Sequence, residues 1–140
     1  MKITGSLRAK VAQRAGFRCE YCLTSEADSV VAFEVDHIFP LKHGGPTLLE
    51  NLAYCCFICN RNKGSNLATA NYPTWRLIPL FNPRIDHWTE HFQIVNGVIQ
   101  ARTEIGQATI KVLDLNHVDR IIERRLQIES GTYPNIPTSD

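Results

Sequence analysis

The 140-residue chain contains no long apolar segment. No run approaches the roughly 18 apolar residues that a membrane-spanning helix needs, so we expect no membrane association. The first residues, MKITGSLRAKVAQRAG, lack the apolar segment of a secretory signal, which predicts a cytoplasmic protein. The chain also lacks internal repeats and low-complexity tracts. One domain, or one small module with an extension, is therefore the expected organisation.

A strong charge of either sign is also lacking, because the net charge is only +1. A small net charge does not by itself indicate nucleic-acid binding, although the distribution of charge matters more than its sum. On composition alone the basic N-terminal segment is a solvated helix face, but it could also lie along phosphates. Before Glu20 there are no acids and five bases, Lys2, Arg8, Lys10, Arg14 and Arg18.

The five cysteines are an odd number, and disulfides are not expected in a reducing compartment. Four of them form two CxxC pairs, Cys19 with Cys22 and Cys56 with Cys59. Four thiolates suit tetrahedral Zn²⁺, and a closed Cys₄ site is structural rather than catalytic. Neighbouring strand residues point to opposite faces, so Cys55 is expected to be a small buried hydrophobe and not a ligand.

Local patterns predict short elements in the first half of the chain. Ser6 can cap a helix that ends at Gly16. Residues 30–38, VVAFEVDHI, favour a strand, and residues 52–58, LAYCCFI, can make a second one. Residues 60–68 are interpreted as a short helix.

The second half has patterns typical of packing rather than chemistry. The pair Asn96-Gly97 lies between two apolar runs, which predicts a hairpin, and a helix is expected over 105–113. The tail from residue 131 is expected to be loose. Asn116 can cap a last helix whose inward face is formed by Val118, Ile121, Ile122 and Leu126.

The stretch FEVDHIFP places Asp36 and His37 at the end of an apolar run. A core strand gains nothing from such a pair, because burying an unpaired carboxylate is costly. Alone, the pair is more often a surface or capping pair than a site. Its meaning depends on the motifs around it.

These motifs occur in the order CEYC, EVDHIFPLKHGGPTLLENL and CFICNRNKG. The order resembles the HNH endonuclease family, the ββα-metal or His-Me finger nucleases, in its zinc-knuckle form. The resemblance covers about residues 18–64 and implies an α+β fold with a ββα-metal core stapled by a Cys₄ zinc site. Residues 1–66 would form this core with its N-terminal helix. Residues 67–140 would form a packed C-terminal extension with a loop, a β-hairpin and two helices, and its stretch FNPRIDHWTEHF resembles an extension of some bacterial members.

The resemblance also implies roles for single residues. His37 matches the general base, and Asp36 matches a ligand of the catalytic metal; we expect both to converge on one phosphate at a frayed strand end. Asn51 matches the Asn that orients the base or its loop. Asn60 stands where the family often has a third His, so this is the HNN variant, with Asn60 as a catalytic metal ligand. Nucleic-acid contacts are expected from Lys63, Arg61 and His43, although His43 could equally be a solvated loop residue.

Two metals with separate tasks follow from these ligands. Oxygen donors from Asp36 and Asn60 suit Mg²⁺ or Mn²⁺, whereas imidazole would favour Zn²⁺ or Ni²⁺. The predicted function is hydrolysis of DNA phosphodiester bonds with catalytic Mg²⁺ or Mn²⁺ and structural Zn²⁺. Double-stranded DNA is the expected substrate, and RNA is left open as an alternative. The sequence also leaves open whether the chain acts as a monomer or a dimer and whether it has a partner protein.

Two alternatives remain at this point. The chain could be a zinc-stabilised nucleic-acid-binding module without catalysis, although the intact catalytic set favours the enzyme. The segment from His87 to His91 also matches the HxxEH pattern of zinc peptidases. Pro83 precedes it closely and no third ligand is evident, so a structural role that packs Trp88 and Phe92 is preferred.

Overall fold

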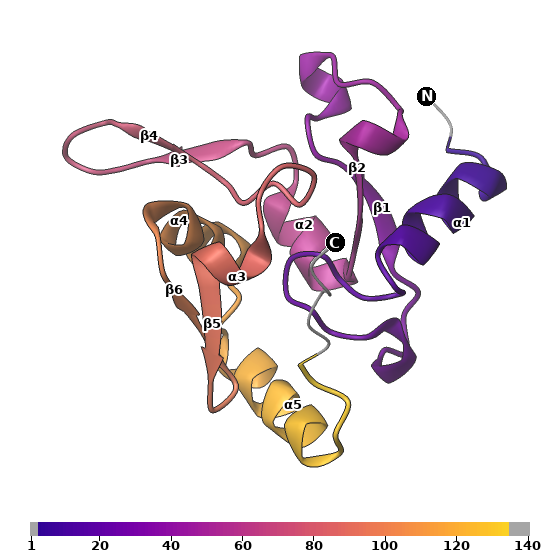
Figure 1. The fold of residues 1–140 in the computed structure, drawn as a ribbon. Helices are drawn as coiled ribbons and strands as arrows, with labels where there is room; N and C mark the ends of the chain where they lie inside the picture. The colour runs from indigo at the N-terminus through magenta and orange to yellow at the C-terminus, as the bar shows by residue number, and fades with distance from the viewer. Residues whose placement is uncertain (1–2, 135–140) are drawn as a thin grey trace.

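The computed structural model describes residues 3–134, so the part of the expected loose tail from residue 135 onward lies outside the described residues. The described chain combines short helices with three two-stranded antiparallel sheets, which confirms the α+β class (Figure 1). None of the helices in this part is both long and apolar enough to span a bilayer.

The first half contains the expected ββα arrangement. Strands β1 (Glu34–His37) and β2 (Leu52–Cys55) pair antiparallel, with Glu34 opposite Cys55 and His37 opposite Leu52. Helix α2 (Phe57–Lys63) follows β2 directly and packs on β1. Helix α1 (Gly5–Arg14) lies against both strands, and three short 3₁₀ turns complete this half: η1 (Glu26–Asp28), η2 (Leu41–His43) and η3 (Leu49–Asn51).

Three predicted boundaries are wrong. The cap of α1 is Thr4, whose Oγ1 accepts from the Leu7 amide at 3.1 Å, so Ser6 lies inside the first turn. Strand β1 begins only at Glu34, and Val30 before it is fully exposed. Helix α2 begins within the segment predicted as a strand, because the Cys56 sulfur caps it by accepting from the Cys59 amide at 3.4 Å.

The second half begins with a hairpin that the sequence did not predict, β3 (Ala68–Ala70) with β4 (Leu77–Pro79), which projects from the body (Figure 1). The predicted hairpin is confirmed as β5 (Phe92–Val95) and β6 (Val98–Ala101), joined by Asn96 and Gly97 at positive φ. Positive φ at both residues is what a tight type I′ turn requires. The helices of this half are α3 (Trp88–His91), α4 (Glu104–Leu113) and α5 (Val118–Glu129).

Helix α5 is turned away from the predicted orientation, and of the four residues expected to face inward only Ile121 is half-buried. Val118, Ile122 and Leu126 are 61%, 51% and 59% exposed, whereas Arg120 and Arg124 are buried. The guanidinium of Arg124 donates to the Gly97 carbonyl at 2.7 Å, which satisfies the turn of the β5–β6 hairpin. Buried carbonyls need donors, so polar residues of α5 face inward.

The cap of α5 also differs from the prediction. His117 caps the helix, because its Nδ1 accepts from the Asp119 amide at 3.2 Å. The side chain of Asn116 instead pairs with both backbone groups of Ile99, at 3.0 and 2.7 Å. The predicted cap residue therefore joins strand β6 to the start of α5.

Buried polar contacts join the two halves. The indole of Trp88 donates to the Tyr21 carbonyl at 2.8 Å, and the Tyr133 hydroxyl donates to the Cys22 carbonyl at 2.9 Å. The Asn62 side chain in α2 also donates to the last carbonyl of α4. The division into a core of residues 1–66 and an extension of residues 67–140 stays a prediction.

Candidate active site and metal centre

The sulfur atoms of the four CxxC cysteines form one cluster. All of them lie within 4.8 Å of one another, and Sγ of Cys22 is 3.8 Å from Sγ of Cys56. Zn–S bonds of about 2.3 Å in a tetrahedron place the sulfurs about 3.8 Å apart, so the cluster fits Zn²⁺. Cys55 is fully buried outside the cluster, with its sulfur 3.7 Å from the Glu34 carbonyl, as predicted for a small hydrophobe.

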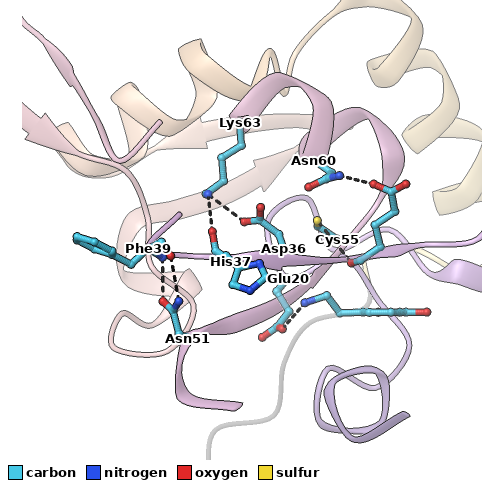
Figure 2. Close-up of polar contacts among 10 residues, drawn as sticks. Glu20, Asp36, His37, Phe39, Asn51, Cys55, Asn60 and Lys63 are labelled. Carbon is cyan, nitrogen blue, oxygen red and sulfur yellow. Dashed lines mark hydrogen bonds and ion pairs between the residues drawn. The ribbon is translucent and has the colours of Figure 1, made fainter. Parts of the chain in front are cut away.

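Helix α2 covers the face of β1 that carries Asp36. Nζ of Lys63 lies 2.9 Å from Oδ2 of Asp36, and Nδ2 of Asn60 donates to the Glu34 carboxylate. Figure 2 shows Asp36, Lys63 and Asn60 on this side of the strand. The face of β1 that α2 covers therefore carries two acids, each in contact with a side chain of α2: Asp36 with Lys63 and Glu34 with Asn60.

The imidazole of His37 lies on the other side of β1 (Figure 2). The strand stays paired with Leu52 up to this residue, so the side chains keep alternating. The expected frayed strand end, with Asp36 and His37 converging on one side, is therefore not observed. Nε2 of His37 lies 2.9 Å from Oγ1 of Thr47. Burial lowers the pKa of His37 below its usual value near 6.5, which leaves the ring neutral at neutral pH.

Asn51 closes the loop between the two strands. Its Oδ1 accepts from the Phe39 amide at 2.8 Å, and its Nδ2 donates to the carbonyls of Phe39 and Pro46 at 3.0 and 2.8 Å. The same loop requires a glycine at position 45, because a Cβ there would lie 1.7 Å from the Phe39 carbonyl oxygen. Asn51 thus holds the loop that carries Thr47, the partner of His37.

Replacing Asn51 by alanine is expected to lower the free energy of unfolding by about 1.5–4.5 kcal/mol, since three hydrogen bonds of about 0.5–1.5 kcal/mol each are lost. Urea titration followed by circular dichroism measures the change. The matched control is Asn66→Ala, at an exposed position, which should stay within about 0.5 kcal/mol of the parent chain. Equal stabilities of the two variants would contradict the loop-closing role of Asn51.

Lys63 is buried, with only 2% of its surface exposed. Its ammonium contacts Asp36 and donates to the His37 carbonyl at 3.3 Å, so a phosphate contact would require it to leave both. Burial raises the pKa of Asp36, and the charge of Lys63 opposes this shift. The geometry thus favours Lys63 as the residue that holds Asp36 in place.

Replacing Lys63 by methionine should leave Asp36 buried without its cation. Removing one partner of a buried pair typically costs about 3–5 kcal/mol, and this is the loss we expect in chemical denaturation. The double variant Lys63→Met with Asp36→Leu should recover most of that loss. A single variant as stable as the parent chain would show that the pair does not hold Asp36.

The other predicted nucleic-acid contacts are solvent-accessible. Arg61 is exposed in the last turn of α2, and its guanidinium lies over the Phe57 ring at 5.3 Å. His43 is exposed at the end of η2, with its ring 6.5 Å from that of Phe39. Neither side chain is committed to the interior, so both stay predictions as phosphate contacts.

The basic N-terminal helix is partly structural. The guanidinium of Arg14 donates to the carbonyls of Leu49 and Leu52 at 2.7 and 2.6 Å, and that of Arg8 donates to the Phe33 carbonyl. These two bases anchor α1 to the strands, which the prediction of a solvated face or a phosphate contact did not foresee.

The two-residue period of a strand predicts that Glu34 shares the face of Asp36, either as a supporting acid or facing solvent, and its carboxylate accepts from Asn60 on that face. One residue of the site was not assigned from the sequence. Thr47 carried no signal, because its partner His37 is ten residues away across an irregular loop.

The HxxEH segment does not form a metal site among the described residues, where the Cys₄ group is the one cluster of potential ligands found. Helix α3 spans only four residues, and Nδ1 of His91 lies 2.7 Å from Oγ1 of Thr103. Trp88 is buried, with its ring centre 4.9 Å from that of Phe92. The structure thus supports the preferred packing role.

Comparison with known proteins agrees with the resemblance seen in the sequence. Residues 19–66 match the family model described as HNH endonuclease, which confirms the resemblance and supports a nuclease-type function. The chain is also similar to the Septu protein PtuB of Bacillus thuringiensis, with 28% identity over 122 residues. The alignment covers 85% of this chain but 44% of that protein, so the chain spans less than half the length of its relative. No solved structure matches the chain significantly.

Proposed function

We propose that the chain is a metal-dependent HNH endonuclease that hydrolyses phosphodiester bonds of DNA in the cytoplasm. The observation that carries the proposal is the ββα unit within the matched segment, which places Asp36 on the face of β1 that α2 covers, carries Asn60 on α2 itself and holds His37 at the end of β1. Residues 1–66 would supply the chemistry, and the chain would act as a monomer or dimer, with a partner protein left open.

The side chains of Asp36 and Asn60 fit a hard divalent cation. Asp36 offers carboxylate oxygen, and Asn60 uses its amide nitrogen toward Glu34, which leaves its Oδ1 as a potential ligand. These oxygen donors suit Mg²⁺ or Mn²⁺. When bound, the cation would stabilise the negative charge that develops on the phosphate.

His37 fits the task of the general base. A neutral imidazole can accept a proton from water, and burial keeps the pKa of His37 low enough for the neutral form at neutral pH. If Nε2 donates its hydrogen to Thr47, Nδ1 is left as the proton acceptor. Thr47 would then fix the tautomer and the orientation of the ring.

The Cys₄ cluster is proposed to hold structural Zn²⁺. Its four sulfur ligands leave no open position for water, so the ion would stabilise the fold and take no part in hydrolysis. Exposed bases such as Arg61 would contact phosphates, and DNA binding should therefore weaken strongly as salt is raised.

The test is incubation of the purified chain with supercoiled plasmid in Mg²⁺, Mn²⁺, Ni²⁺, Zn²⁺ or EDTA. Nicking or linearisation with Mg²⁺ or Mn²⁺, abolished by EDTA, would support the proposal. Cleavage only with Ni²⁺ or Zn²⁺ would contradict the oxygen-ligand site. Plasmid binding without cleavage under any of these conditions would favour the non-catalytic zinc-stabilised module.

A further inference from the structure

An arginine from the extension reaches the cysteine cluster. Nη2 of Arg120, in the first turn of α5, lies 3.0 Å from Sγ of Cys59 and 3.9 Å from Sγ of Cys56. Only 7% of the Arg120 surface is exposed, and the residue is 61 positions away from Cys59 in the sequence. The contact therefore joins two distant segments inside the protein.

The other terminal nitrogen of the Arg120 guanidinium is also hydrogen-bonded. Nη1 donates to the carbonyls of Leu113 and Asp114, at 2.9 and 3.1 Å, where helix α4 ends. The neighbouring buried base, Arg124, is held elsewhere, by Gly97 and Asn116. The planar fork of Arg120 thus bridges the end of α4 and the sulfur atoms, which a single ammonium group could not do in the same way.

The contact places a positive charge beside a metal site whose own charge is negative. Zn²⁺ with four thiolates carries a net charge of −2, and a buried charge without compensation is costly. Each knuckle provides one amide toward a sulfur, from Cys22 to Cys19 and from Cys59 to Cys56, at 3.4 Å in both cases. Amides contribute only partial charges, whereas Arg120 brings a full positive charge.

We propose that Arg120 is a charge partner of the zinc centre, so that the metal site is completed by the C-terminal extension. The inference rests on the proposal that the Cys₄ cluster binds Zn²⁺, but it does not depend on nuclease activity. Because binding effects are reciprocal, the docking of α5 strengthens zinc binding, and bound zinc strengthens the docking of α5.

The experiment measures the zinc affinity of the full chain by competition with a chromogenic chelator. The variants are Arg120→Met, which removes the charge, and Arg120→Lys, which keeps the charge but not the fork. The matched control is Arg125→Met, on the exposed side of the same helix. Loss of a residue that contacts metal ligands typically weakens metal binding about 10–100-fold, and this is expected for Arg120→Met, with Arg120→Lys between it and the parent chain.

The outcomes separate the two proposals. A parent chain that binds no zinc would overturn the Cys₄ site itself. A parent chain with one zinc, together with an Arg120→Met affinity within twofold of the Arg125→Met control, would overturn the role of Arg120 alone. If Arg120→Met does not fold, the rate of zinc transfer to the chelator is compared for Arg120→Lys and Arg125→Lys. At least threefold faster release from Arg120→Lys supports the role, and equal rates overturn it.

Discussion

Replacing His37 by alanine is expected to reduce DNA cleavage by about 10²–10⁴-fold, the usual contribution of a general base. The variant should fold like the parent chain, because the one side-chain hydrogen bond described for His37 is that with Thr47. Initial rates of plasmid nicking with Mg²⁺ or Mn²⁺ measure the loss. Zinc content and circular dichroism show whether the structure is retained.

The matched control is His87→Ala. His87 is exposed just before α3, and its side chain makes no capping hydrogen bond there. This control also removes one of the two histidines of the HxxEH pattern, so it tests whether that segment takes part in DNA cleavage. Cleavage that survives His37→Ala but not His87→Ala would show that the active site lies in the second half of the chain and not at His37.

Replacement by alanine should have a large effect at Cys56 and a small effect at its neighbour Cys55. Cys56→Ala removes a proposed zinc ligand, and structural zinc contributes about 10–16 kcal/mol in small zinc-finger peptides. Whole domains are stable by only about 5–15 kcal/mol, so this variant should lose its zinc and its cooperative thermal transition. Cys55→Ala removes a buried sulfur outside the cluster and should cost about 1 kcal/mol, with zinc retained.

The zinc content and the thermal denaturation of the two variants, measured side by side, test the assignment of the zinc ligands. The two residues are adjacent and of the same type, so expression and handling are well matched, whereas Cys55 ends β2 and Cys56 caps α2. If Cys56→Ala kept one zinc per chain and melted like Cys55→Ala, the assignment of the four ligands would have to be abandoned.

The parts of the site that the sequence predicted are those that depend on short motifs. Each CxxC pair is local, and a shared metal is the simplest reason for two such pairs, so the cluster could be expected without coordinates. The two strands and the short helix after them were predicted from local patterns, and the resemblance implied that they form one ββα unit. The boundaries of these elements were not all predicted correctly, because the sulfur of Cys56 caps a helix where apolar residues favoured a strand.

The orientation of α5 could not be predicted from apolar periodicity. Val118, Ile122 and Leu126 have the spacing of a buried face, yet they are exposed. What decides the orientation is the need for donors at a hairpin turn, at the end of α4 and at the sulfur cluster, and only the end of α4 lies near α5 in sequence. The burial of Lys63 has the same origin, because its partner Asp36 is a strand residue far along the chain.

The distance between the cysteines and Arg120 has a consequence for synthesis on the ribosome. All four cysteines leave the exit tunnel before the arginine, which follows Cys59 by 61 residues. At about 5–20 residues per second, that interval lasts roughly 3–12 s. During this interval, a nascent chain that has captured zinc exposes its thiolates without the positive charge of Arg120. The metal is therefore most easily removed at this stage of synthesis.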